Sequence, residues 1–104
     1  MEKNPQIIRL SGRIDATTAP GMEKELFSGI EEGTRAMIID LEAVDYMSSA
    51  GLRVLLSALK KMKSVGGEVR LSSLQPHVRE VFEMTGFSRL FTICADIDDA
   101  QTSF

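Results

Sequence analysis

Residues that form disulfides and metal sites are almost missing from this chain. Its 104 residues include one cysteine, Cys94, and one histidine, His77. A single cysteine cannot form an intrachain disulfide and suits a reducing compartment, so we expect a cytoplasmic protein. One histidine and one cysteine supply too few ligands for zinc, and the acidic residues near the C-terminus lack the calcium-loop pattern (Asp96, Asp98 and Asp99). We therefore expect no metal and no other cofactor.

Catalytic motifs are missing as well. A Ser-His-acid triad would have to use His77, which we place on the exposed first turn of a helix that begins after Pro76. The stretch Ser48-Ser49-Ala50-Gly51 has neither the glycine spacing nor the lysine of a phosphate-binding P-loop. The sequence thus favours a binding protein over an enzyme. A small enzyme that binds a nucleotide or phosphate metabolite at this helix start remains an alternative.

Blocks of basic residues and long apolar runs are also lacking. Twelve Lys and Arg residues stand against fifteen Asp and Glu residues, which gives a net charge of −3. Nucleic acids and anionic membranes are held largely through basic groups, so we expect neither as the main partner. No apolar run reaches the roughly 18 residues of a membrane span, and the first residues are polar. We expect no direct membrane insertion and no secretion signal.

Strand and helix patterns alternate along the chain. We expect strands at 5–14, 35–41, 68–72 and 91–94, and helices at 19–32, 49–65 and 76–85. This order predicts an α/β fold with a mainly parallel sheet of about four strands. We expect a single domain over residues 1–104, with a core at about 6–94. The acidic tail, 95–104, is expected to form at most a partial helix that frays toward Phe104.

The most informative stretch runs from Val44 to Leu52 and joins the most apolar strand to the longest helix. Serine is a favoured N-cap, so one of Ser48 and Ser49 is expected to cap the helix. The second serine leaves a reachable hydroxyl at a helix N-terminus, where unpaired backbone N–H groups and the helix dipole tolerate a phosphate. We place Met47 in this loop as a flexible apolar side chain that is exposed to a partner.

Several motifs in the same order resemble the STAS-domain anti-sigma-factor antagonists of bacteria. The central one is Tyr46-Met47-Ser48-Ser49-Ala50-Gly51-Leu52, which follows Ile38-Ile39-Asp40-Leu41. The others are Leu10-Ser11-Gly12-Arg13-Ile14-Asp15, Lys63-Ser64-Val65-Gly66-Gly67 and Val81-Phe82-Glu83-Met84-Thr85-Gly86-Phe87. Together they span about residues 7–93. The resemblance implies a STAS-like single domain that acts as a phosphorylation switch.

In that family the unphosphorylated protein binds an anti-sigma factor, which is also a serine kinase, and so frees a sigma factor for transcription. The kinase phosphorylates a loop serine and breaks the complex, and a serine phosphatase restores it. The resemblance places the phosphorylated serine at Ser49, with Ser48 as the alternative, and places a family aspartate at Asp15. The partner-binding residues are then Asp15, Met47, Ser48, Ser49, Ala50, Gly51 and Arg53.

The chain also differs from the usual family pattern. Ser48 stands where many members carry Asp, and Ala50 replaces a common Ser or Thr. Family members usually open with an additional strand before the one that contains Ile7, whereas only six residues precede Ile7 here. The sheet would then have an exposed edge, which favours a homodimer or pairing with a partner. These differences support a second hypothesis, an unphosphorylated STAS scaffold in a stress-signalling assembly or in a membrane transporter.

Overall fold

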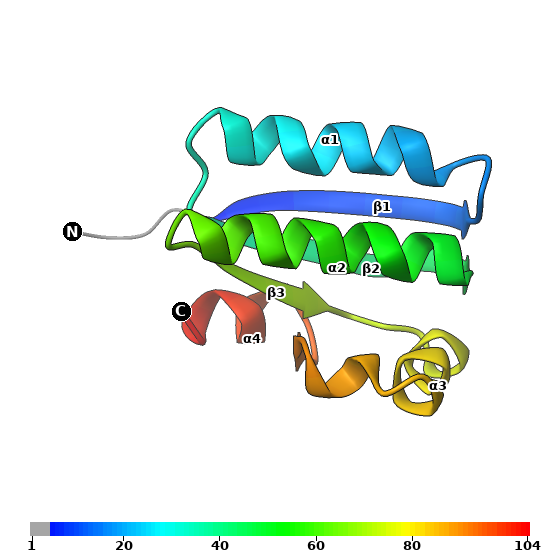
Figure 1. Ribbon diagram of the computed structural model, residues 1–104. Coiled ribbons are helices and arrows are strands. Elements are labelled where there is room, and N and C mark those ends of the chain that lie inside the picture. Colours follow the sequence, from blue (N-terminus) through cyan, green and yellow to red (C-terminus); the bar gives the residue numbers. More distant parts are fainter. Residues whose placement is uncertain (1–4) are drawn as a thin grey trace.

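The computed structural model describes residues 5–104 and shows a four-stranded sheet with helices on both faces (Figure 1). The strands are β1 (Gln6–Ile14), β2 (Ala36–Met47), β3 (Glu68–Ser72) and β4 (Thr92–Cys94). The helices are α1 (Ala19–Glu31), α2 (Ser49–Ser64), α3 (Pro76–Met84), the short 3₁₀ helix η1 (Phe87–Arg89) and α4 (Ile97–Thr102). The strand order is β1-β2-β3-β4, and every neighbouring pair is parallel. The expected α/β class and parallel sheet are therefore confirmed.

Strand β2 lies inside the sheet and is covered on both faces at its centre. Its residues from Ala36 to Leu41 are all buried. Met37, Ile39 and Leu41 belong to the main core with α1, α2 and α3, whereas Ile38 packs with Cys94 and Ala100 on the α4 face. This division follows the two-residue period of a strand, and it explains why the segment reads as a nearly continuous apolar run.

Strand β2 is longer than the sequence predicted. We expected it to end at Leu41, but it continues to Met47 because its second half pairs with β1, where Arg13 lies opposite Tyr46 and Ile14 opposite Met47. The pairing register shifts between Arg9 and Ser11 and between Gly12 and Arg13, and Gly12 has a φ of 76°. These irregularities in β1 let the long strands stay paired to their ends.

The C-terminal segment is more ordered than the sequence predicted. We expected a partial, fraying helix after residue 95, but α4 is formed and its Ala100 is fully buried. Asp96 caps α4 by accepting a hydrogen bond from the Asp99 N–H at 2.8 Å, and the Arg70 guanidinium lies over the Phe104 ring at 4.6 Å. The segment is held because it covers the face of the sheet opposite α1 and α2.

Strand β1 is an edge strand within residues 5–104, with β2 as its neighbour. We expected the chain to lack the additional first strand of the family. Residues 1–4, where part of such a strand would lie, are outside the described residues. In the described part of the chain, none of the helices is both long enough and apolar enough to cross a membrane.

Candidate functional site

The carboxyl ends of β1 and β2 bring together the two turns that carry the predicted site. The backbone N–H of Ser48 donates to the Ile14 carbonyl at 2.9 Å, which continues the β1–β2 pairing to the first residue after β2. Asp15 follows Ile14 directly, so the turns that lead into α1 and α2 start side by side. This edge of an open parallel sheet is where α/β folds place binding sites.

Ser48 is the N-cap of α2. Its backbone is extended, with φ −93° and ψ 172°, and its hydroxyl oxygen accepts from the Gly51 N–H at 3.4 Å. That distance exceeds the usual range for an N–H···O bond, so the cap is weak. The backbone also contributes, because the Leu52 N–H donates to the Ser48 carbonyl at 3.0 Å.

Ser49 is the first residue of α2 and is exposed. Within residues 5–104, no hydrogen-bond partner holds its hydroxyl group. The positive end of the α2 dipole lies at this turn, and no acidic residue occupies the first turn of the helix. A free hydroxyl at such a position can accept a phosphate without disturbing the hydrogen bonds of the fold.

Met47 and Gly51 do not form the exposed surface that the sequence suggested. The expectation of an exposed Met47 is wrong, because this last residue of β2 is 3% exposed and belongs to the main core. Gly51 is also buried, and a Cβ atom there would overlap the Met47 sulfur and the Ile14 side chain. The glycine is therefore needed for close packing of α2 on the strand ends, and both residues support the turn from below.

Asp15 is held by the turn in which it lies. Its Oδ1 accepts from the Thr17 hydroxyl at 2.7 Å and the Thr17 N–H at 2.9 Å, and its Oδ2 accepts from the Arg13 Nε at 3.1 Å. These bonds, the Thr17 hydroxyl first, lower the pKa of Asp15 from 3.8 to about 2. Asp15 therefore provides a negative charge in a fixed position, directly after Ile14, whose carbonyl accepts from the Ser48 N–H.

Arg13 and Tyr46 are two residues of this region that the sequence did not single out. The Arg13 guanidinium lies 3.9 Å from the centre of the Tyr46 ring, and it also pairs with Asp15. Tyr46 is 40% exposed. The two residues face each other because Arg13 and Tyr46 are register partners across β1 and β2, so only the register of the bulged strands could have predicted the contact.

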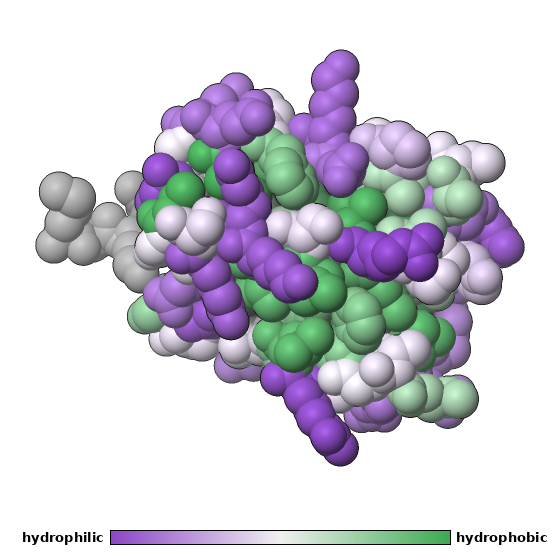
Figure 2. Space-filling model, viewed as in Figure 1, coloured by the Kyte–Doolittle hydropathy of each residue, from purple (hydrophilic) through white to green (hydrophobic). Residues whose placement is uncertain are grey.

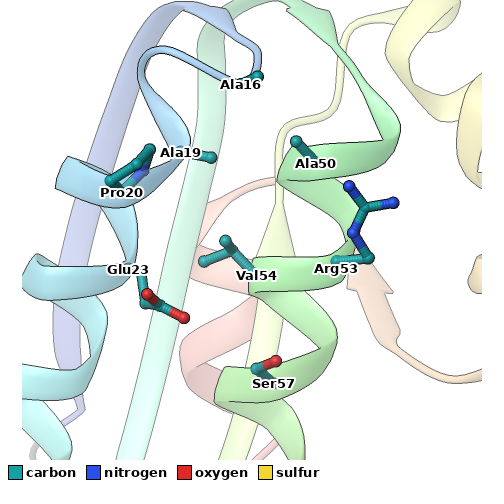
Figure 3. A pocket seen from close by; sticks show the side chains of 8 residues that line it. All are labelled: Ala16, Ala19, Pro20, Glu23, Ala50, Arg53, Val54 and Ser57. Atoms are coloured by element: carbon teal, nitrogen blue, oxygen red, sulfur yellow. The ribbon is translucent and has the colours of Figure 1, made fainter.

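A hollow of about 300 Å³ lies between α1 and α2, beside the Ser49 turn (Figure 3). Figure 3 shows that Ala19 of α1 and Val54 of α2 point toward each other, whereas Arg53 projects from another side of α2. The hollow is lined by Ala16, Ala19, Pro20, Glu23, Ala50, Arg53, Val54 and Ser57. Ala50 and Arg53, two of the predicted site residues, are both among the residues that line this hollow, which the sequence did not reveal.

Helix α3 supports the same end of β2. The side-chain N–H of Gln75 donates to the Glu42 carbonyl at 2.8 Å, and the His77 ring contacts the Asp45 carbonyl oxygen. His77 is exposed on the first turn of α3, as expected. Across residues 5–104, no group of three or more His, Cys, Asp or Glu residues could hold a metal ion. The two turns thus form a small polar surface on which the Ser49 hydroxyl is exposed and has no hydrogen-bond partner within residues 5–104.

The geometry at this edge is that of an open parallel sheet with an exposed serine, Ser49, at the start of the helix that follows its second strand. The model of the STAS domain family matches residues 1–100, and the chain belongs to this family. Membership confirms both the resemblance seen in the sequence and the expected class, a binding protein and not an enzyme.

The relatives have consistent names. "Putative anti-sigma factor antagonist BtrV" of Bordetella bronchiseptica is 41% identical over 95 residues, which cover 91% of this chain and 82% of that protein. The crystal structure of an anti-sigma factor antagonist from Mycobacterium paratuberculosis is 30% identical, with a TM-score of 0.85 over 93% of this chain and 82% of that one.

A more distant structure shares the fold. The Bacillus cell fate determinant SpoIIAA, solved in its phosphorylated form, has a TM-score of 0.71 and 21% identity over 94% of this chain and 89% of that chain.

Proposed function

We propose that this protein is an anti-sigma-factor antagonist whose binding is switched off by phosphorylation of Ser49. The observation that carries the proposal is the exposed Ser49 hydroxyl, which has no partner within residues 5–104, next to a Ser48 that caps α2. The relatives named as anti-sigma factor antagonists support the role. The partners are an anti-sigma factor that is also a serine kinase, and a serine phosphatase that acts on the phosphorylated form. We place this cycle in the bacterial cytoplasm.

The surface around Ser49 accounts for binding in the unmodified state. Ala50 leaves little bulk beside the hydroxyl, and the hollow between α1 and α2 offers apolar contact area to the kinase. Asp15 and Arg53 contribute charges of opposite sign that orient the partner. Met47 and Gly51 act from within the core by fixing the turn.

Phosphorylation changes the surface more than it changes the fold. A phosphate on Ser49 adds about −1.5 to −2 charges at neutral pH, and the N-terminus of α2 stabilises that charge. A bound partner would have to desolvate the dianion close to the ionised Asp15. Imperfect pairing of such a charge costs on the order of several kcal/mol, which is enough to dissociate a complex.

We also propose that the chain forms one domain and that two copies can pair. Residues 1–104 act as one STAS domain in which α4 covers the second face of the sheet. A homodimer would form at the edge of β1 that pairs with no other strand within residues 5–104, where a strand of a second copy can be added.

The test begins with affinity-tagged protein, from which the kinase is co-purified and incubated with ATP. Mass spectrometry is expected to place the phosphate on Ser49. Ser48→Ala is expected to remain a substrate, whereas Ser49→Ala is not, and phosphoserine installed at position 49 is expected to weaken kinase binding at least about tenfold. Phosphate found on Ser48, or tight binding by the phosphoserine protein, would contradict the switch.

The same purification tests the alternative role. Capture of a transporter protein or of a large assembly of STAS proteins, with no kinase and no phosphate on the chain, would favour an unphosphorylated scaffold. A tagged protein that carries Ser49→Ala is the matched control, since a scaffold that never uses the hydroxyl would recover the same partners with either version.

A further inference from the structure

Helix α2 is basic although the protein is acidic. It has four cationic residues and no Asp or Glu, while the chain as a whole has a net charge of −3. The cations are Arg53, Lys60, Lys61 and Lys63. Lysines in the last turn complement the helix dipole, and that accounts for their position along the axis. The dipole does not explain why Lys60 and Lys63 lie on the face of α2 that also carries Leu56 and Leu59.

The C-terminal half of α2 borders a groove. Leu56, Leu59, Lys60 and Lys63 follow the spacing i, i+3, i+4 and i+7, so they lie along one face of the helix. A hollow of about 130 Å³ at this face is lined by Leu59 and Lys63 of α2, residues of β3 and β4, and Leu90. Leu90 follows η1 and is 48% exposed, one of the few large apolar side chains left open to solvent. We call this surface, from Leu56 to Lys63 on one side and Arg89 and Leu90 on the other, the α2–η1 groove.

The hydropathy of the surface agrees with an apolar groove beside α2. Figure 2, in the orientation of Figure 1, shows an apolar strip below α2 with long hydrophilic side chains along its borders. Lys60, Lys63 and Arg89 are all exposed. Glu68, the one carboxylate among the residues that line the hollow, pairs with Arg70 at 3.0 Å. The groove therefore has apolar side chains, Leu59, Val69 and Leu90, beside Thr92 and the Glu68–Arg70 pair, and exposed cations along its border.

We propose that the α2–η1 groove binds an acidic amphipathic helix of a partner protein. From Leu56 to Lys63 the groove follows about two turns of α2, or roughly 10 Å, and a partner helix can lie along it with its apolar residues on Leu59 and Leu90. Glu or Asp residues on the flanks of that helix would meet the lysines. The groove lies at the opposite end of α2 from Ser49, so the phosphorylated turn and this surface can be occupied independently.

The test uses ¹⁵N-labelled protein and a synthetic peptide helix with leucines at i, i+3, i+4 and i+7 and glutamates on its other faces. Saturable shifts are expected in the amide resonances of Leu56, Leu59 and Leu90, with weaker binding at high salt. A matched peptide with lysine in place of each glutamate is expected to produce no saturable shifts. Equal binding of both peptides, or shifts confined to other surfaces, would overturn the proposal.

Variants of the protein identify the residues responsible. Lys60→Glu with Lys63→Glu, and separately Leu90→Ala, are each expected to weaken the acidic peptide about tenfold. Lys24→Glu on α1 is the control, because it changes charge by the same amount per residue on a distant exposed helix, and unchanged affinity is expected. Concentration-dependent shifts at the groove without peptide would show that a second copy occupies it and would contradict the proposal. No kinase takes part in this assay, so its failure would leave the Ser49 proposal standing.

Discussion

The two strand-to-helix turns at the carboxyl edge of the sheet use their polar residues differently. In the turn that leads into α1, Asp15 accepts three short hydrogen bonds from Thr17 and Arg13, and the Thr18 hydroxyl donates to the Arg13 carbonyl at 2.9 Å. In the turn that leads into α2, one bond of 3.4 Å is the only side-chain cap that residues 5–104 provide. The first turn uses its polar groups to fix the backbone. The second leaves the exposed Ser49 hydroxyl without a hydrogen-bond partner within residues 5–104.

The turn that leads into α2 is held in place by the packing of Gly51 against the ends of β1 and β2. Gly51 sits against Met47 and Ile14 so closely that any Cβ atom would overlap them. Replacing Gly51 by Val is therefore expected to lower the free energy of unfolding by about 1–3 kcal/mol, the usual cost of overpacking a core. Urea unfolding followed by circular dichroism measures the change. This is the largest effect expected at either turn.

The matched control is Ala16→Val, at an exposed position in the turn before α1. A change within about 0.5 kcal/mol is expected there, as for most surface substitutions. Equal losses of unfolding free energy in both variants would mean that the β-branched side chain itself is destabilising. The close packing around Gly51 would then not explain the difference between the two turns.

The hydrogen bonds of the first turn predict a pH dependence. The pKa of Asp15 is lowered to about 2 in the folded state, so its contribution to stability is present above pH 4 and is lost as the pH falls from about 4 to about 2. Asp15→Asn is expected to be less stable than the wild type at neutral pH, by less than Gly51→Val. The difference is expected to shrink as the pH falls toward 2 and to vanish only below the folded-state pKa, and urea unfolding across this pH range checks the decrease.

Asp45→Asn is the control for that experiment, because within residues 5–104 no hydrogen bond holds the exposed Asp45 carboxylate. Its stability is expected to follow the wild-type pH profile. A constant gap between Asp15→Asn and the wild type down to pH 2 would mean that the turn is stabilised by the shape of the side chain and not by its charge.

The sequence predicted the sheet well because apolar periodicity reflects burial. The run from Met37 to Leu41 is apolar except for Asp40 and is buried on both faces, and the helical spacing of Leu52, Leu55 and Leu59 gives the buried stripe of α2. The extension of β2 was missed, since polar residues interrupt the pattern after Leu41 and the strand continues only through its pairing with β1. Helix α4 was expected to be partial at most, and its order was underestimated for a similar reason, because it depends on burial of Ala100 against distant residues.

The candidate site could be predicted where neighbouring residues in the sequence determine the structure. A serine pair before a helical pattern predicts a cap and a free hydroxyl, and the structure has Ser48 as the cap and Ser49 exposed. The burial of Met47 could not be predicted, because it depends on Ile14 from another strand and on the absence of a side chain at Gly51. The Arg13–Tyr46 contact requires the register of two bulged strands, which sequence alone does not define.

The smallest expected effects separate the two serines. Ser48→Ala removes the side-chain cap and is expected to cost about 0.5 kcal/mol, at the low end for N-caps because the 3.4 Å bond is long. Ser49→Ala removes a hydroxyl with no partner within residues 5–104 and introduces a better helix former, so its unfolding free energy is expected to stay the same or rise slightly. Thermal and urea unfolding of the two variants, prepared side by side, measure both values. A larger loss for Ser49→Ala than for Ser48→Ala would exchange the roles, making Ser49 the cap and Ser48 the free hydroxyl open to a kinase.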